Sequence, residues 1–312
     1  MRLDRPATRE YRTWITDSRR WSRYTPRASD VVIATYPKCG TTWMERIVGA
    51  LVFQTPEPMP FSREISLWID SRTTTKSLDA AMATIEAQTH RRFLKAHLPF
   101  DGLPIFDEVK YIHVARDGRD AVMSWHDDDK AWLPEVIERL DANGLADPAI
   151  GRPYPPLIDD PAEQFHRWLT EGASGDQPDG CPNISYFQCE ATWWEARHRP
   201  NVLMVHYSDL KGDLAGRVAR IAAFLGIPLA DGLLAEVVAA ADFRAMQRDG
   251  AALLPHHVNV FRDGHRSMLN KGTAGRWRGV FRVDDLALYE AKLEATLAPE
   301  CAAWLENGGA AP

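Results

Sequence analysis

Short apolar runs alternate along the chain with longer segments whose apolar residues recur at helical spacing. Four of the short runs are typical of buried β-strands, because they are nearly continuous in apolar residues. They lie at residues 31–35, 93–98, 109–115 and 202–207. Helical spacing is found at residues 43–52, 133–140, 161–169, 191–198, 215–225, 237–246 and 284–297. This alternation predicts an α/β fold with a mainly parallel central sheet flanked by helices.

The remaining segments are less regular. We expect residues 1–29 to form a helix or loop against the flank of the first strand, and residues 61–92 to form helices and loops beside the substrate. Residues 127–162 predict a long loop with one helix, of the kind that builds lids and substrate walls. Residues 248–280 are irregular and in places basic. Neither a repeat nor a linker is evident, so we expect residues 1–312 to form a single domain.

The first predicted strand leads through a polar loop, residues 36–42, into an amphipathic helix. A strand, a Gly-containing loop and a helix in this order present free backbone N–H groups and a positive helix end, which suits a phosphate. Lys38 adds a cation within the loop. The usual phosphate-loop pattern GxxxxGK[ST] is absent, since Lys38 precedes Gly40 and Thr41-Thr42 follow it. The pattern therefore predicts a phosphate loop of another kind.

Composition limits the classes of function. Of 312 residues, 45% are hydrophobic and 26% are charged, as in a globular protein with a large core. A net charge of −6 argues against general nucleic-acid binding but permits a local basic pocket. The four cysteines form no CxxC pair, which indicates reduced thiols. No apolar leader or membrane-length run is evident, so we expect a soluble cytoplasmic protein that binds neither nucleic acid nor membrane.

Four separated motifs stand out, namely TYPKCGTTW (35–43), KAHLP (95–99), VARDGRDAVMS (114–124) and LNKGTAGRWRGVF (269–281). In this order and spacing they closely resemble those of the cytosolic sulfotransferase family, and the similarity extends over most of the chain. The resemblance implies a P-loop NTPase-like sulfotransferase fold. It also implies transfer of a sulfuryl group from 3′-phosphoadenosine 5′-phosphosulfate (PAPS) to a hydroxyl of a small-molecule acceptor, with 3′-phosphoadenosine 5′-phosphate (PAP) as product.

The resemblance also assigns the donor site. The loop residues would hold the 5′-phosphosulfate, and Arg116 with Ser124 would grip the 3′-phosphate. Arg116 follows a predicted strand, where ligands of α/β folds bind, and a guanidinium fork suits phosphate. Trp43 would lie beside the adenine, although a core position explains it equally well. The complete implied donor set is Lys38, Cys39, Gly40, Thr41, Thr42, Trp43, Arg116, Ser124, Tyr207, Phe243, Met246, Asn270, Lys271 and Gly272.

The catalytic set implied by the resemblance is His97, Lys38, Lys95 and Ser124. Transfer to a hydroxyl requires removal of its proton, which a histidine does well near neutral pH. Lys95 lies two residues before His97, hence on the same side of a strand, where it can stabilise charge on the transferred group. No metal is expected, because lysines can fulfil this role. We interpret residues 127–129 (DDD) as a solvated loop rather than a metal site.

Several positions depart from the family pattern. Asn270 replaces a usual arginine, so we expect a weakened grip on the 3′-phosphate unless Arg262, Arg266 or Arg276 compensates. Cys39 replaces a usual serine. Its place at a helix start beside Lys38 predicts a lowered thiol pKa and sensitivity to alkylation. Only Val283 of the dimer motif known from animal members is kept, which leaves the oligomeric state open.

Two other functions share some of these features. A small-molecule kinase using ATP and Mg²⁺ would have a similar sheet and phosphate loop, but it should carry GK[ST]. A nucleotide-binding protein without activity would not need Lys38, Lys95 and His97 together. For the acceptor, aromatic residues suggest a phenol or another hydrophobic alcohol, although each of them is also a core candidate. These residues are Phe61, Trp68, Trp132 and Trp193.

Overall fold

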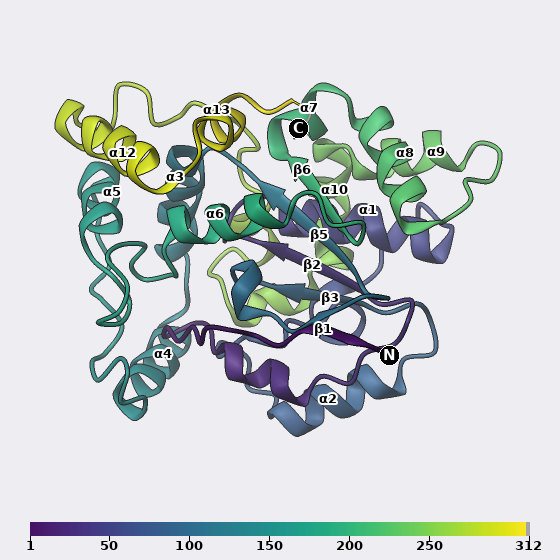
Figure 1. The fold of residues 1–312 in the computed structure, drawn as a ribbon, viewed down its shortest axis with the longest axis horizontal. Helices are drawn as coiled ribbons and strands as arrows, with labels where there is room; N and C mark the ends of the chain where they lie inside the picture. Colours follow the sequence, from purple (N-terminus) through teal and green to yellow (C-terminus); the bar gives the residue numbers. More distant parts are fainter. Residues whose placement is uncertain (310–312) are drawn as a thin grey trace.

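A computed structural model, which describes residues 1–309, contains a central sheet of four parallel strands (Figure 1). The strands are β2 (Val31–Thr35), β3 (Phe93–Ala96), β5 (Lys110–Ala115) and β6 (Val202–His206). Their order in the sheet is β3-β2-β5-β6, and every pairing is parallel. This arrangement confirms the predicted α/β fold. It also brings the carboxyl ends of all four strands to the same edge of the sheet.

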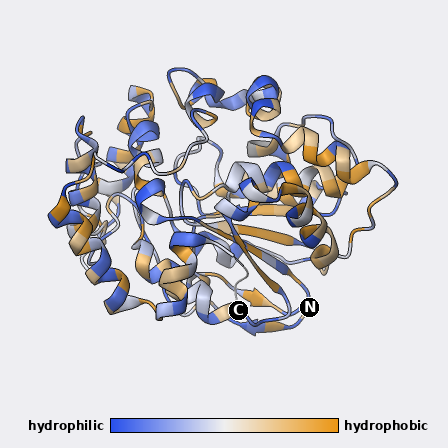
Figure 2. Cartoon of the chain, turned by 90° about the horizontal axis from the view of Figure 1, so that it is seen from above, coloured by the Kyte–Doolittle hydropathy of each residue, from blue (hydrophilic) through white to orange (hydrophobic). Residues whose placement is uncertain are grey.

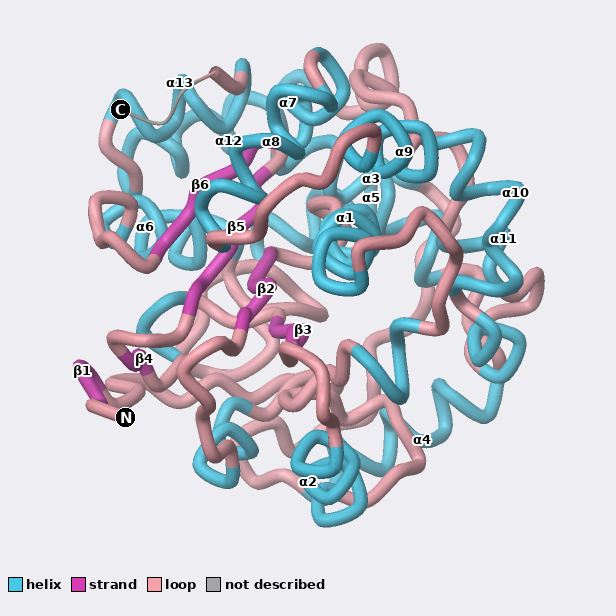
Figure 3. Tube along the Cα trace, turned by 90° about the vertical axis from the view of Figure 1, so that its right-hand side faces the viewer, coloured by secondary structure: helices cyan, strands magenta, loops and turns pink. Residues whose placement is uncertain are grey.

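Helices cover both faces of the sheet, which explains why its strands are apolar throughout (Figure 2). The face formed by Val31, Ile33 and Ile112 packs on α1 (Thr41–Phe53), α8 (Leu214–Leu225), α9 (Leu233–Ala241) and α10 (Phe243–Leu253). The face formed by Val32, Ala34 and Tyr111 packs on α5 (Pro161–Thr170), α6 (Tyr186–Ala196), α12 (Val283–Thr296) and α13 (Pro299–Asn307). Figure 3 shows the sheet between α1 and α9 on one side and α6 on the other.

Several elements differ from the sequence prediction. The helix expected at 237–246 is two helices, because Asp242 begins a new one: its carboxylate accepts a hydrogen bond from the Arg244 backbone N–H at 2.9 Å. Residues 127–129 end α3 (Gly118–Asp129), and α4 (Pro134–Ala146) is longer than predicted. A two-stranded sheet of β1 (Leu3–Arg5) and β4 (Ile105–Phe106) and the helix α13 were not predicted.

The remaining helices complete the described chain. They are η1 (Ser18–Arg23), η2 (Phe61–Ile65), α2 (Leu78–Ala87), η3 (Phe100–Gly102), α7 (Tyr207–Gly212), η4 (Pro255–Asn259) and α11 (His265–Met268). The first residues of the chain do not form an isolated arm, since Trp21 and Tyr24 pack in the same core cluster as Val32. None of the helices described between residues 1 and 309 is both long enough and apolar enough to cross a membrane.

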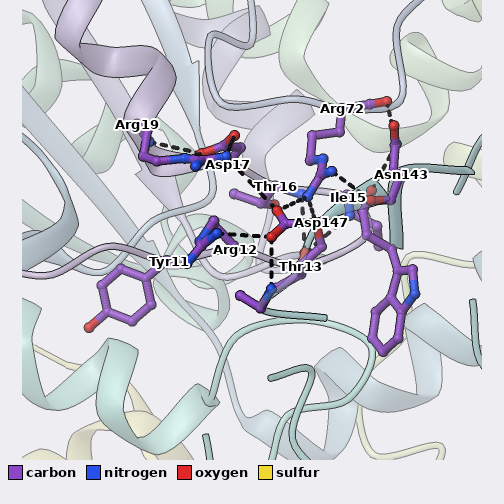
Figure 4. Close-up of polar contacts among 12 residues, drawn as sticks. Tyr11, Arg12, Thr13, Ile15, Thr16, Asp17, Arg19, Arg72, Asn143 and Asp147 are labelled. Atoms are coloured by element: carbon purple, nitrogen blue, oxygen red, sulfur yellow. Dashed lines mark hydrogen bonds and ion pairs between the residues drawn. The ribbon is translucent and has the colours of Figure 1, made fainter. Parts of the chain in front are cut away.

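A buried carboxylate, Asp147, fastens the N-terminal segment to the end of α4 (Figure 4). Its side chain is 3% exposed and accepts from Arg12 Nη1 at 2.9 Å and from Arg72 Nη1 at 3.0 Å. Arg72 also donates to the carbonyl oxygens of Thr13 and Asn143. The segments that carry Arg12, Arg72 and Asp147 are distant in sequence. They therefore meet at one carboxylate beside the end of α4.

Replacing Asp147 by alanine should lower the free energy of unfolding by roughly 3 kcal/mol, because it removes one partner of a buried ion pair. The matched control is Asp176→Ala, since Asp176 pairs with Arg9 but its side chain is 58% exposed. That variant should lose less than about 1 kcal/mol. Urea unfolding of both variants measures the two losses in free energy of unfolding. Equal losses would show that the ion pairs of Asp147 contribute no more than an exposed pair does.

Candidate functional site

One cavity of about 270 Å³ at the carboxyl edge of the sheet is lined by all the predicted site residues except Cys39. Each strand delivers a site residue at this edge. The phosphate loop follows β2, His97 follows β3, Arg116 follows β5 and Tyr207 follows β6. A crevice outside the carboxyl ends of parallel strands is the usual ligand site of open α/β sheets. The structure thus brings together residues that lie as far apart in the chain as Lys38 and Gly272.

The phosphate loop turns sharply before α1. Lys38 and Gly40 both have left-handed backbone conformations, with φ of 69° and 108°. At Gly40 a side chain would also crowd Tyr207, since a Cβ there would lie 3.0 Å from the ring. The Oγ1 atom of Thr41 lies 2.6 Å from that of Thr35, which ties the start of α1 to the end of β2. The loop therefore presents its backbone to the cavity at close range.

Lys38 forms an ion pair with a residue that the sequence analysis placed elsewhere. Its Nζ lies 2.9 Å from Asp128 Oδ1, and both side chains are more than nine-tenths buried. The interpretation of residues 127–129 as a solvated loop is therefore wrong. Asp129 accepts from the Tyr154 hydroxyl at 2.6 Å, and burial raises its pKa to about 6. The motif lies on the last turn of α3, where its carboxylates meet cations and hydroxyls across the cavity wall.

His97 is oriented as a proton acceptor toward the cavity. Its Nδ1 lies 2.9 Å from the carbonyl oxygen of Thr35, which can only accept, and 3.3 Å from the Thr35 hydroxyl, which can donate or accept. The shorter contact assigns the proton to Nδ1. The lone pair is then on Nε2. Burial, followed by the positive charge of Lys95, lowers the pKa of His97 well below its ordinary value. The ring is thus neutral at neutral pH, as a general base must be.

Two side chains beside His97 restrict its movement. The Asp70 carboxylate accepts from the His97 backbone N–H at 3.2 Å and from the indole N–H groups of Trp21 and Trp68 at 2.9 and 2.6 Å. Trp68 meets the imidazole edge-on at a centroid distance of 4.8 Å, and Lys95 Nζ lies 4.8 Å from the centroid of the Trp68 ring. Asp70 was not identified from the sequence, where no motif marks it.

Arg116 connects the phosphate loop to the late loop at residues 270–276. Its Nη1 donates to the Lys38 carbonyl at 3.1 Å and its Nη2 to the Thr273 carbonyl at 3.4 Å. The guanidinium also lies 4.4 Å from the Tyr207 ring centroid. Arg116 is 7% exposed, so its guanidinium is part of the buried wall and not of the outer surface. Ser124 lies in the same cavity wall, on the following helix.

The aromatic residues of the predicted adenine side lie together. Trp43 and Tyr207 meet edge-on at 5.4 Å, and Trp43 Nε1 donates to the Ala241 carbonyl at 2.8 Å. Phe243 packs against Gly272, where φ is 61° and a Cβ would lie 2.8 Å from the ring. Met246 is buried and lines the same cavity. Trp43 is therefore both a packed helix residue and part of the cavity wall.

Cys39 does not fit its predicted role. Its side chain is fully buried in the core cluster that contains Tyr36 and Ala115, and burial raises its pKa well above the ordinary value. The prediction of a reactive thiol is wrong because the side chain points into the protein, while the neighbouring Lys38 ammonium turns to Asp128.

The aromatic residues proposed for the acceptor pocket divide into two groups. Trp68 and Trp132 line the cavity. Phe61 packs in the core beside Phe93, and Trp193 stacks on His113 at 4.6 Å, so their assignment to the pocket is wrong. Cavity-lining residues not singled out from the sequence include Ser71, Thr73, Lys76, Trp125, Phe261 and Met268. Among residues 1–309, no group of three or more His, Cys, Asp or Glu side chains is arranged to hold a metal ion.

Comparisons with known proteins give independent information on the chain. Residues 28–298 match the family model described as a sulfotransferase domain. A glycolipid sulfotransferase of Mycobacterium bovis is 31% identical, over 96% of this chain and 94% of the relative. Sulfotransferase 1E1 of Bos taurus is 25% identical, over 88% of this chain and 85% of the relative. The crystal structure of mouse sulfotransferase SULT7A1 complexed with PAP shares the fold, with a TM-score of 0.66 at 20% identity, over 91% of this chain and 90% of that chain.

Alkylation should now be slow at every cysteine of the folded protein, because all four thiols are buried. Timed labelling with iodoacetamide, followed by mass spectrometry of peptides, should show Cys39 modified at least about tenfold more slowly in the native than in the urea-unfolded protein. Labelling of native Cys39 at the unfolded rate would mean that the thiol is accessible after all. Cys181 offers an internal comparison, since it is also buried and burial raises its own pKa to about 11.

Proposed function

Because the chain belongs to the sulfotransferase family, we propose that it moves a sulfuryl group from PAPS to a hydroxyl of a small-molecule acceptor, with His97 as general base. The observation that carries this proposal is the orientation of His97. A neutral imidazole with its proton held by the Thr35 carbonyl lies in the same cavity as Lys38 and Lys95. A base and two cations in one cavity match the two needs of sulfuryl transfer, proton removal and charge stabilisation.

The charge of the cavity supports an anionic donor. Six lysine and arginine side chains line it against two carboxylates, those of Asp127 and Asp128, although the whole chain has a net charge of −6. The six are Lys38, Lys76, Lys95, Arg116, Lys271 and Arg276. PAPS would supply the sulfuryl group and leave as PAP. The phosphate loop and Arg116 would hold its phosphates, and the aromatic group around Trp43 and Tyr207 would receive the adenine.

The residues of this chain then have distinct tasks in the reaction. His97 Nε2 takes the acceptor's hydroxyl proton as the acceptor oxygen forms its bond to sulfur. The bond between sulfur and the bridging phosphate oxygen breaks, and its electron pair stays on that oxygen. Lys38 and Lys95 stabilise the charge that develops on the oxygens around sulfur. The Thr35 carbonyl stabilises the imidazolium formed at His97, because it accepts a hydrogen bond from Nδ1.

The acceptor is proposed to be a hydrophobic alcohol or a phenol. Trp68, Trp125, Trp132 and Phe261 supply apolar wall, whereas Ser71, Thr73 and Lys76 add polar groups to the same cavity. A mixed wall of this kind also suits an amphipathic molecule with a polar head. A screen with labelled donor should compare phenols, long-chain alcohols and glycolipids as acceptors. Glycolipids are included because the mycobacterial relative is named a glycolipid sulfotransferase.

Thermal unfolding tests the donor class. PAP should raise the melting temperature, because a ligand that binds only the folded state stabilises it by RT ln(1 + [L]/Kd). At 100-fold excess over Kd the gain is about 2.7 kcal/mol. ATP with Mg²⁺ should have a smaller effect at equal concentration. Stabilisation by ATP with Mg²⁺ alone would contradict the proposal in favour of a kinase.

Replacing His97 by alanine should lower turnover by about 10²–10⁴-fold, which is the usual contribution of a general base. The affinity for PAP, measured by calorimetry without acceptor, should stay within about twofold, since the base acts on the acceptor. The control is His166→Ala, because the His166 side chain is 52% exposed and pairs with Asp285 outside the cavity. Loss of PAP affinity with normal turnover would refute the assignment of His97.

A further inference from the structure

A pair of cations in the late loop shares one carboxylate of α3. Arg276 Nη1 lies 2.7 Å from Asp127 Oδ2, and Lys271 Nζ lies 3.3 Å from the same oxygen. Both cations and the carboxylate line the cavity. The Arg276 side chain is 23% exposed, so most of it is buried. The sequence leaves Arg276 as one of three arginines that could compensate for Asn270.

The place of this cluster is defined by α3 and by Arg116. Asp127 follows Ser124 by three residues, so the two side chains are neighbours on the helix surface. Arg116 reaches the Thr273 carbonyl, which lies within the loop between Lys271 and Arg276. Arg116, Lys271 and Arg276 therefore line the same cavity as Ser124. Such a group suits an anion with several terminal oxygens, and a guanidinium can bind two of them at once.

The position that was expected to supply an arginine does not carry a charge. Asn270 is exposed, and its backbone carbonyl accepts from Gln247 Nε2 at 2.9 Å. Of the three arginines considered as substitutes, Arg276 lines the cavity, whereas Arg262 and Arg266 are absent from its lining within the described residues. The structure therefore favours Arg276 as the substitute for the missing arginine.

We propose that Arg276 binds the 3′-phosphate of the nucleotide in place of the arginine missing at position 270. Asp127, which lies one helical turn from Ser124, orients Arg276 and Lys271. The inference rests on the proposed function, since it concerns the same nucleotide. It is more specific than the proposed function, because it concerns one phosphate group. The part of the nucleotide affinity that the 3′-phosphate contributes depends on Arg276, which lies six positions after Asn270.

The test compares adenosine 3′,5′-bisphosphate with adenosine 5′-monophosphate by calorimetry. Arg276→Ala should weaken bisphosphate binding about tenfold or more, because a hydrogen bond to a charged group is lost, while monophosphate affinity stays within about twofold. Arg278→Ala is the matched control: Arg278 lies on the same loop but is exposed, with its guanidinium 4.6 Å from the Trp277 ring centroid. It should leave both affinities unchanged.

Asn270→Arg gives a second, independent readout. If Arg276 already fills the role, the added arginine should change bisphosphate affinity by less than about threefold. A tenfold gain would mean that the phosphate lacks its partner, and it would overturn the proposal. Unchanged bisphosphate affinity in Arg276→Ala, or equal loss for both nucleotides, would also overturn it. Failure of the unaltered protein to bind the bisphosphate at all would instead contradict the proposed function.

Discussion

The concentration of positive charge in one cavity is the constraint on which the rest of the site depends. Like charges repel more strongly where protein replaces water, so six cations around one cavity would destabilise the fold if nothing opposed them. The last turn of α3 opposes them directly. Asp128 meets Lys38, and Asp127 meets Lys271 and Arg276. In the sequence these carboxylates are a simple acidic run. In the fold they offset the repulsion among the cations when no ligand is bound.

The parallel sheet fulfils a second requirement, which is the orientation of the His97 imidazole. The strands β2 and β3 are neighbours, so the carbonyl at the end of one lies beside the imidazole at the end of the other. This backbone contact determines which nitrogen of His97 carries the proton without a further charged group. Asp70 fixes the backbone of His97 and the indole of Trp68 from behind. The chemistry of the site therefore relies on strand register as much as on side-chain identity.

The features that could be read from the sequence are those with local causes. Continuous apolar runs identified the four strands, and the loop motif identified the phosphate-binding turn, because each depends on neighbouring residues. Contacts over long distances escaped detection. Asp128 resembles any solvated aspartate until the fold brings it to Lys38, 90 residues away. Cys39 has neighbours that favour a reactive thiol, but packing decides the direction of its side chain. The sequence likewise shows that Phe61 and Trp193 are aromatic, but it does not show whether their side chains point into the core or into the cavity.

The helix α3 carries consecutive residues that face different parts of the cavity. Ser124 lines the cavity that also contains the cations of the late loop, whereas Trp125 packs edge-on against Trp132 in the aromatic wall, at a centroid distance of 5.9 Å. Any ligand that shifts one of these residues acts on the same rigid element as a ligand at the other. Thermodynamic linkage then requires that each ligand change the affinity of its partner by the same factor.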